Sequence, residues 1–543
     1  MFYMCTVNQP SLSEQPDLLG NGQLFEELSG EPAPMEAPES VEPETPKVAL
    51  EDLKLRLIDR QQVRLATIDV EELIPATHKA RAIWELTGML DLKGFYEGLR
   101  TAEGSKGRAA WDPRLLVSIW VYALSEGITS AREIERMMAY EPALLWLSGM
   151  QEINHHTLSD FRAEKQEALD DLFSQLLLLL EQQGLVKLER VMHDGTKIEA
   201  FAGSDSFRRE KTVRRQLEQI KAVVAELESR PDGEQSKARQ AARERAAREQ
   251  KERLQQALAE LTEEIQKGNK TPEEEQKARV SLTDPEARIM KHGDQAFGPA
   301  YNLQITTDAE QKVIVAVALN QCSSDAPALD SAIQQVEERM GRAPGQVVVD
   351  GGYSSQDNII GMSEQGVDLI GPLGDQDKRK QNALKSSGIA PGFEPEKFVQ
   401  IDGTSSLQCP AGKVLTYVRQ SQKKHNRYHQ YQAKTEDCTS CPFQPQCCPR
   451  SAGKGRTVSL LVHEPEAVVK FREKMEQEGP RQIYKQRGAV AEFPNAWIKE
   501  KIGLRKFRLR GLVKSATEAL WSCLTYNIMI WKRLVWCGAA ITA

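Results

Sequence analysis

The sequence has no long hydrophobic run. Its most apolar stretch, residues 519–531, is too short to cross a bilayer and is followed by Lys532 and Arg533, so we expect a buried helix there. The first residues lack a basic segment followed by an apolar one. We therefore expect no secretory signal and no membrane partner.

Net positive charge is also missing. The chain has 71 Lys and Arg residues against 78 Asp and Glu residues, a net charge of −7. This balance argues against a uniformly basic nucleic-acid coat. The charge is uneven, however, because residues 1–50 are acidic and rich in proline whereas residues 481–515 are strongly basic. A local basic groove is therefore compatible with the sequence.

Cysteine is scarce before residue 400. The chain has nine cysteines, an odd number, and most follow that point. This distribution fits a reducing compartment and a metal site better than a disulfide framework. Cys409, Cys438, Cys441 and Cys447 could bind a structural Zn²⁺ tetrahedrally, and Cys448 competes with Cys447 for the fourth place. The alternative is a set of reduced thiols without a metal.

At 543 residues the chain is long for one domain, so two or three domains are expected. Its composition changes along the chain in a way that suggests five parts. We predict a disordered acidic leader at 1–48, a helical domain at 50–185, an α/β core at 186–373 with a helical hairpin inserted at about 205–280, a Cys-rich insertion at 374–480, and the rest of the core with C-terminal helices at 481–543.

Helix signals dominate residues 50–185. Asp112 and Pro113 open an apolar helix, Ser130 can cap a second one, residues 154–162 read as a turn followed by a new helix start, and residues 172–180 form a leucine-rich buried helix. Short helices joined by tight turns are compatible with a helix-turn-helix module, although most three-helix clusters bind no DNA.

Strand signals begin after residue 187. A short strand is predicted to end at Asp194, residues 301–307 and 313–319 form a β-hairpin, a helix covers 326–340, and a buried strand at 346–349 runs into Asp350. A further helix and a strand at 367–370 follow. This order predicts a mixed α/β sheet with acids at strand ends.

A third acid, Glu492, lies in the basic segment 484–511. Lys499 follows two helical turns later on the same face. Pro494 fits only in the first turn of a helix, so we expect Glu492 at or near a helix start. Two strand-end aspartates and this glutamate can meet at one sheet edge and hold two divalent cations, for which oxygen ligands favour Mg²⁺ or Mn²⁺. Each acid taken alone is more often an ordinary turn or surface residue.

Together these pieces resemble the DDE transposases of bacterial insertion sequences. The segments that carry the resemblance are DGTKIEA at 194–200, DPEARIMKHGDQAFGPAYNLQ at 284–304, VVVDGGYSS at 347–355, the cysteine insertion, and Y-x-x-R…E-x6-K at 484–499 with GLRKFRLRG at 503–511. The resemblance extends over nearly all of residues 60–533. It implies a ribonuclease-H-like catalytic core of mixed sheet and helices.

The resemblance also assigns roles to individual residues. It implies that Asp194, Asp350 and Glu492 are the catalytic acids and the Mg²⁺ or Mn²⁺ ligands. The residues that it implies for DNA contact are Tyr484, Arg487, Lys499, Arg505, Lys506, Arg508 and Arg510. One departure from the family pattern is that four residues separate Arg487 from Glu492, and another is that proline follows Phe493 and not the glutamate.

The implied activity is metal-dependent DNA cleavage at the terminal inverted repeats of the protein's own element. Cleavage would free a 3′ hydroxyl, which then attacks target DNA by in-line transesterification without a covalent enzyme intermediate. The helical domain would bind the ends, a homodimer would pair them, and the protein would act in the bacterial cytoplasm at the nucleoid. Two alternatives stay open: an inactive or repurposed DNA-binding protein, and a metal-dependent nuclease without strand transfer.

Four further polar residues lie near these acids. We expect His193 to be structural and not a metal ligand, and Asp308 and Asp325 to be turn and helix-cap residues. Glu199 is a spare carboxylate that could reach the same sheet edge.

Overall fold

The computed structural model describes residues 61–99 apart from 62, 64 and 66, and residues 109–229, 237–267, 271–293, 296–372, 382–450 and 452–537. The chain divides into two compact units, Met1–Thr67 and Ile68–Ala543. All of the named helices and strands belong to the second unit. The predicted leader, residues 1–48, lies outside the described residues.

The first part of this unit is helical, as the sequence predicts. Asp112 caps α3 by accepting a 2.9 Å bond from the N–H of Arg114, and Asn154 caps α6 by accepting a 2.8 Å bond from the N–H of His156. Ser130 precedes α4 but makes no capping bond. The elements are η2 (Val70–Leu73), α1 (Lys79–Met89), α2 (Lys93–Tyr96), α3 (Pro113–Ser125), α4 (Ala131–Met137), α5 (Pro142–Ser148), α6 (His155–Glu164) and α7 (Gln166–Gln182).

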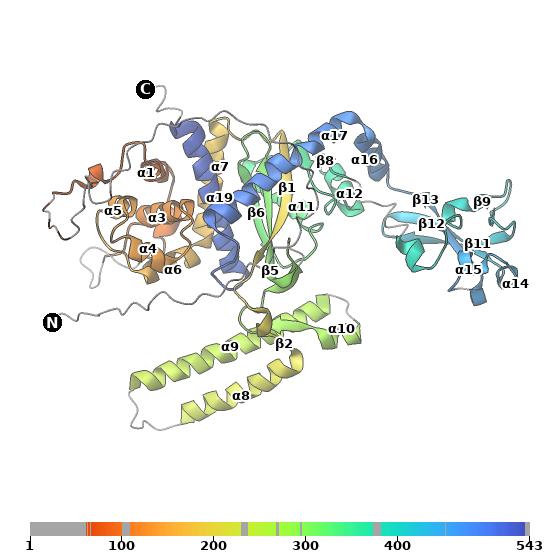
Figure 1. Ribbon diagram of the computed structural model, residues 1–543, viewed down its shortest axis with the longest axis horizontal. Coiled ribbons are helices and arrows are strands. Elements are labelled where there is room, and N and C mark those ends of the chain that lie inside the picture. Colours follow the sequence, from red (N-terminus) through yellow and green to blue (C-terminus); the bar gives the residue numbers. More distant parts are fainter. Residues whose placement is uncertain are drawn as a thin grey trace, which may run out of the picture. The chain divides into compact units, whose positions relative to one another are not determined.

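A helical hairpin follows where the leucine spacing predicts it. Helices α8 (Glu210–Ser229) and α9 (Lys237–Lys267) lie side by side (Figure 1) and share a small core around Leu217, Leu254 and Leu261. The remaining elements of this part are η3 (Ser204–Ser206), β2 (Phe207–Arg209), α10 (Pro272–Lys277) and β3 (Arg279–Ser281). Strands β2 and β3 pair at the base of the hairpin.

The largest sheet has six strands in the order β4-β5-β1-β7-β8, with β6 also paired to β5. Its strands are β1 (Arg190–Glu199), β4 (Arg288–Lys291), β5 (Phe297–Asp308), β6 (Ile314–Asn320), β7 (Gln346–Val348) and β8 (Asp368–Ile370), with α11 (Ala328–Met340) and α12 (Gln356–Glu364) between them. Strands β5 and β6 form the predicted hairpin. Helices α11 and α19 (Leu512–Trp531) pack on β6 (Figure 1). The sheet is mixed, as expected.

Strand β1 is longer than the sequence predicts. Asp194 lies in its middle and not at its end, because β5 pairs with β1 from Val191 to Glu199 and keeps the strand extended. The parallel neighbour β7 pairs only with Arg190 to Met192. Asp194 therefore follows the end of the parallel pairing, although the strand continues.

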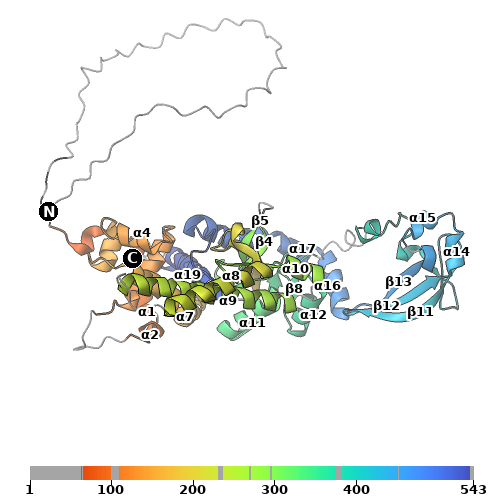
Figure 2. The ribbon, with the colours of Figure 1, turned by 90° about the horizontal axis from the view of Figure 1, so that it is seen from below.

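A second sheet, which the sequence analysis did not predict, lies in the Cys-rich part. Its strands are β9 (Val399–Gln400), β10 (Ser406–Gln408), β11 (Val414–Lys423), β12 (Asn426–Ala433) and β13 (Thr457–His463), paired in the order β13-β12-β11-β10-β9. Figure 2 shows β11, β12 and β13 of this sheet. The strands are hard to predict because most side chains of β11 are exposed and show no apolar alternation. The short helices here are η4 (Pro395–Lys397), α14 (Thr435–Thr439), α15 (Gln444–Cys447) and η5 (Ala452–Lys454).

Glu492 lies at the start of a short helix that has Pro494 in its first turn, as predicted, but the residues before Glu492 are helical as well. Helices α16 (Glu466–Glu476), α17 (Glu478–Lys485), η6 (Gly488–Glu492), α18 (Phe493–Trp497) and η7 (Ile498–Ile502) lead to α19 and η8 (Lys532–Trp536). Glu492 has helical dihedral angles and lies inside the run that begins at Glu478. Segment η6 is a π-turn, whose carbonyls bond five residues ahead, and this wider turn accommodates Pro494 without breaking the run.

The apolar stretch 519–531 lies in α19 and is largely buried, as predicted. Over the described ranges, no helix has both the length and the apolar character that crossing a membrane requires.

Candidate active site

Asp194 lies on β1, and Asp350 follows the end of the neighbouring strand β7 by two residues. In the parallel pairing of β1 with β7, Met192 is opposite Val348. Two residues further along each chain, this register sets Asp194 beside Asp350. The chain turns directly after Asp350, whose carboxylate accepts a 2.8 Å bond from the N–H of Gly352. The sheet therefore brings together two acids that are 156 positions apart, counting from 194 to 350.

Arg487 joins these two carboxylates. Its Nη2 lies 2.8 Å from Asp194 Oδ1 and 3.9 Å from Asp350 Oδ2. The amide of Asn495 donates a 3.2 Å bond to the other oxygen of Asp194. Burial raises the pKa of Asp194, the charge of Arg487 opposes that shift, and the charges of Asp350 and Glu492 add to it. Asp350 and Glu492 thus both lie within electrostatic reach of Asp194.

Packing fixes the helical run that carries Glu492. Val490 and Ala491, the two residues before it, pack on Met192 of β1 and Val348 of β7. Glu492 itself is exposed beside this contact. Because η6 lies directly on the two strands that carry the aspartates, Glu492 is held near them while its carboxylate stays accessible.

Lys499 lies further along the same helical run and also contacts β1. Its Nζ donates to Thr196 Oγ1, and Thr196 shares a face of β1 with Asp194 because side chains alternate along a strand. Burial and then the charge of Arg505 lower the pKa of Lys499. Arg487, Asn495 and Lys499 therefore all act on one face of β1. Asn495 was missed in the sequence, although its spacing of three from Glu492 and four from Lys499 indicates a shared helical face.

The donors at this place suit a hard divalent cation. Carboxylate and amide oxygens are the preferred ligands of Mg²⁺ and Mn²⁺, and Asn495 Oδ1 is buried with no hydrogen-bond partner in the structure as described. As the side chains stand, no three His, Cys, Asp or Glu residues in the described ranges are grouped to hold a metal. At the aspartates, the guanidinium of Arg487 contacts both carboxylates and supplies positive charge there.

The opposite face of β1 carries a buried polar network. His193 Nδ1 lies 2.9 Å from Thr306 Oγ1, and its Nε2 lies 2.9 Å from Gln304 Oε1, which also accepts a bond from the hydroxyl of Tyr353. Burial lowers the pKa of His193 to about 4. These contacts support the prediction that His193 is structural, since the ring points away from the aspartates.

Asp325 belongs to this network and is not the helix cap that the sequence suggested. Its Oδ1 accepts bonds from Lys197 at 2.7 Å, Asn302 at 2.7 Å and Gln304 at 3.1 Å. These long-range donors, which the sheet brings together, hold the carboxylate in place of a cap. Asp308, by contrast, is a turn residue as predicted, and its carboxylate accepts from the N–H groups of Leu188 and Glu310.

Position 195 of β1 requires a glycine, because the polar network packs closely against it. A Cβ on this residue would lie 2.3 Å from Gln304 Nε2, 2.8 Å from the Tyr353 hydroxyl and 2.9 Å from Asp325 Oδ1. No side chain fits there without moving the network. The Asp-Gly pair at 194–195 therefore places an acid on one face and leaves room for the polar support on the other.

The predicted basic run already has protein partners. Arg505 bonds Glu500, Lys506 Nζ lies 3.7 Å from Glu199, Arg508 Nε donates to Thr129 Oγ1 at 2.8 Å, and the Arg510 guanidinium lies 4.9 Å from the centre of the Phe201 ring. The segment also pairs with the end of β1, where Phe507 donates to the carbonyl of Glu199 at 2.9 Å. Glu199 is therefore occupied there and does not join Asp194.

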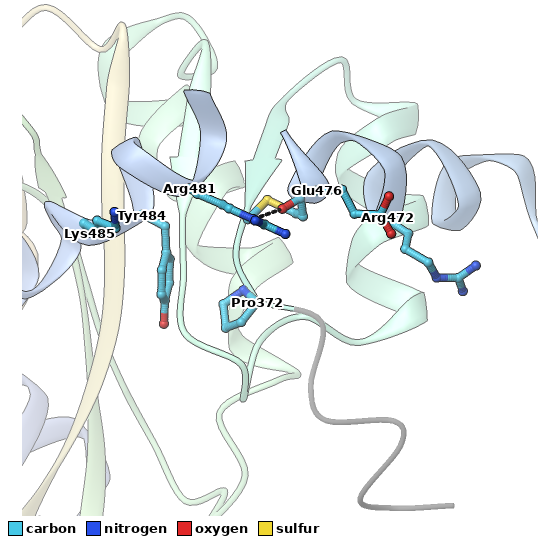
Figure 3. A pocket seen from close by; sticks show the side chains of 7 residues that line it. Pro372, Arg472, Glu476, Arg481, Tyr484 and Lys485 are labelled. Atoms are coloured by element: carbon cyan, nitrogen blue, oxygen red, sulfur yellow. Dashed lines mark hydrogen bonds between the residues drawn. The ribbon is translucent and has the colours of Figure 1, made fainter. Parts of the chain in front are cut away.

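Tyr484 lines a cavity beside the helical run. Figure 3 shows its ring and the Arg481 side chain projecting from α17, with Pro372 nearby and Arg472 on α16. The cavity has a volume of about 420 Å³, and Lys485 also lines it. Tyr484 packs against the same small cluster as Val490. Three cations, Arg472, Arg481 and Lys485, and one acid, Glu476, therefore line this cavity.

The comparisons with known proteins identify two segments. Residues 408–531 match the family described as "Transposase DDE domain", and residues 68–164 match "Transposase domain (DUF772)". The first match contains Arg487, Glu492 and Lys499. Together the two matches indicate a DDE transposase. Members of such families typically use a divalent metal.

Other comparisons add little to this assignment. No curated protein matches the transposase chain. A solved structure of the piggyBac transposase synaptic complex with hairpin DNA is similar at 9% identity, covering 84% of this chain and 81% of that one, with a TM-score of 0.23. At that score the likeness carries no argument about the fold of this transposase. Asp194 and Asp350 lie outside both matched segments.

Proposed function

We propose that this transposase binds the terminal repeats of its element, and cuts and rejoins DNA with Asp194, Asp350 and Glu492 as catalytic acids. The observation that carries the proposal is the register of β1 with β7, which sets the two aspartates side by side. Arg487 contacts both aspartates from the helical run that bears Glu492. Two acids from distant segments thus contact one cation, and that cation comes from the helical run that also carries Glu492.

The strand order supports a ribonuclease-H-like core. In the order β6-β5-β1-β7-β8, the antiparallel strand β5 lies between β6 and β1, and β7 and β8 continue parallel to β1. We propose that residues 186–373 and 481–543 form one such core, with insertions at about 205–280 and 374–480. The helical domain, residues 50–185, would bind DNA ends.

The acids would hold Mg²⁺ or Mn²⁺, two ions in the arrangement that we propose. A bound cation of this kind polarises the attacking oxygen and stabilises the leaving oxygen of a phosphodiester. The protein's own cations have a separate task. Arg487 and Lys499 would neutralise the phosphate oxygens, and the buried Nε of Arg487, which has no hydrogen-bond partner within the described residues, leaves it a donor for that role.

Double-stranded DNA is the proposed partner, both as terminal inverted repeats and as target. Tyr484, Arg487 and Lys499 would contact it near the scissile phosphate, and the run Arg505, Lys506, Arg508 and Arg510 would contact it further along. The partners of that run are mostly exposed, and exposed ion pairs exchange readily for phosphate. Cutting two ends together requires two copies of the chain, so we propose a homodimer on paired ends.

The test compares Glu492→Gln with Glu500→Gln, a matched control on the same helical run. Glu500 is exposed and bonds only to the surface residue Arg505. With end-containing DNA and Mg²⁺ or Mn²⁺, we expect Glu492→Gln to lose cleavage by orders of magnitude while its gel-shift affinity survives. Glu500→Gln should cleave like the parent.

Three results would change the proposal. If Glu492→Gln cuts as the parent does, Glu492 is not the third acid. Cuts without joined products from the parent protein would identify a nuclease without strand transfer. Binding to end DNA without any cutting by the parent would identify a DNA-binding protein that has lost its activity.

A further inference from the structure

Five cysteines line one small cavity in the domain built on β9–β13. The cavity has a volume of about 30 Å³, and the cysteines that line it are Cys409, Cys438, Cys441, Cys447 and Cys448. A space of this size admits one ion or one water molecule. We propose that it is a structural zinc site whose ligands are Cys409, Cys438, Cys441 and Cys447.

The sulfurs reach the cavity from three separate elements. Cys409 follows β10, Cys438 lies in α14 and Cys447 ends α15. These three side chains pack against the same apolar cluster, which includes Leu407 and Val458. The thiols are therefore gathered by the fold of the domain and not by their proximity in the sequence.

Two of the sulfurs accept backbone hydrogen bonds. The N–H of Lys413 donates to Cys409 Sγ at 3.2 Å, and the N–H of Arg456 donates to Cys438 Sγ at 3.3 Å. The first bond depends on a tight turn, in which Gly412 has φ +79° and donates to the carbonyl of Cys409. Backbone bonds of this kind orient the sulfur, as outer-shell partners do for the ligands of a metal site.

A buried cation beside the thiols points to an anionic group in the cavity. The side chain of Arg456 lines the cavity, and the residue is only 8% exposed. Its Nε is buried and has no hydrogen-bond partner in the described chain. A buried positive charge is costly without a compensating negative one. Zn²⁺ with four thiolates carries a net charge of about −2, which supplies that compensation.

Cys447 is a better candidate than Cys448 for the fourth zinc ligand. The side chains of Cys409, Cys438 and Cys447 pack against the same apolar cluster, to which Cys448 does not belong. Cys448 is almost fully buried, so we assign it to the interior of the domain.

The side chains would have to turn to bind the ion. Over the ranges that the structure describes, no three of them converge as they stand. A metal that draws them together would staple a domain whose apolar core is small, namely Phe398, Leu407, Leu415, Tyr431, Ala433 and Val458. Small cores commonly need such a staple. The site would thus hold the domain together and take no part in DNA chemistry.

The experiment measures metal content and not DNA cleavage, so its outcome is independent of the proposed catalytic acids. The full chain, expressed with zinc in the medium, is analysed by elemental mass spectrometry, and its thiols are titrated before and after chelation. We expect one zinc per chain, with four thiols that react only after the metal is removed. Parent protein that contains no zinc and whose thiols all react freely would overturn the proposal.

Variants test the ligand assignment. Cys441→Ser should lose the zinc, and Cys448→Ser, the matched control, should keep it. Because a ligand variant can also fail to fold, Co²⁺ substitution of the parent provides a second measurement, with a thiolate-to-cobalt charge-transfer band expected. A Cys448→Ser protein without zinc, or a cobalt spectrum without that band, would contradict the assignment.

Discussion

The two faces of strand β1 differ in exposure and in chemistry. One face carries Asp194 and Thr196, whose partners Arg487 and Lys499 are charged and come from a helical run. The other carries His193, Gly195 and Lys197, which meet buried amides and hydroxyls and the partly buried carboxylate of Asp325. Residues one position apart therefore belong to different environments. One face is open to ions and phosphate, and the other holds the strand in position.

This contrast explains why the network is polar although it is buried. Gln304 bonds His193, Tyr353 and Asp325 together, and Tyr353 lies three residues after Asp350. The network thus ties the turn that bears Asp350 to the strand that bears Asp194. A hydrophobic core would pack as well but would not specify the register of two short strands so closely. We call the face with Asp194 and Thr196 the acidic face, and the face with His193, Gly195 and Lys197 the support face. The support face is expected to fix the geometry of the site, and the acidic face to supply its chemistry.

The largest expected effect is on the acidic face. Asp194→Asn keeps the shape of the side chain but removes the charge that a divalent cation needs. We expect cleavage of end-containing DNA to fall by about a thousandfold or more, while the free energy of unfolding changes by no more than about 1 kcal/mol because like-charge repulsion from Asp350 is also relieved. Urea unfolding and cleavage assays on the same preparation measure the two effects. Large loss of stability in Asp194→Asn would place Asp194 in the support network instead.

The second prediction concerns the support face. Gly195→Ala inserts a methyl group within 3 Å of three network atoms. Overpacking of this kind should lower the free energy of unfolding by about 2–3 kcal/mol. Cleavage should fall at temperatures where the variant is still folded, because the two aspartates lose their alignment. If the variant has the stability and cleavage rate of the parent, the network can adjust to the methyl group and does not determine the register of β1 with β7. Gly361→Ala in α12, where an added Cβ would meet nothing within 4 Å, is the control for a methyl group that does not touch the network.

Local features of the fold could be predicted and long-range ones could not. The caps Asp112 and Asn154 were predictable because a cap depends on neighbouring residues alone. The length of β1 was not, because it is fixed by β5, which lies about a hundred residues later. The acids Asp194 and Asp350 could be selected by their position near strands. Their pairing depends on the register with β7, and the partners Gln304, Asp325 and Tyr353 depend on the whole sheet.

The third prediction uses the pH dependence of stability. Burial lowers the pKa of His193 to about 4, below the ordinary value of 6.5. Between these values the unfolded chain binds a proton that the folded chain excludes, so stability falls as pH falls from 6.5 towards 4. From pH 7 to pH 5 this residue should lose about 2 kcal/mol. The measurement is urea unfolding at both values for the parent and His193→Asn. An equal loss in both proteins would show that His193 is not the cause.

The smallest effect compares one lysine on each face. Lys499 donates to Thr196 on the acidic face, and Lys197 Nζ lies 2.7 Å from Asp325 on the support face. Both are partly shielded from water, yet only Lys499 is expected to meet a phosphate. Lys499→Ala should lower the slope of log affinity against log salt by about one unit, because one fewer counterion is released from DNA. Lys197→Ala should leave that slope unchanged and instead lower the free energy of unfolding, since Asp325 then keeps a buried charge with one donor fewer. Gel shifts at several salt concentrations and urea unfolding separate the two variants. If Lys197→Ala changes the salt slope and Lys499→Ala does not, DNA approaches β1 from the other side, and the assignment of the two faces must be exchanged.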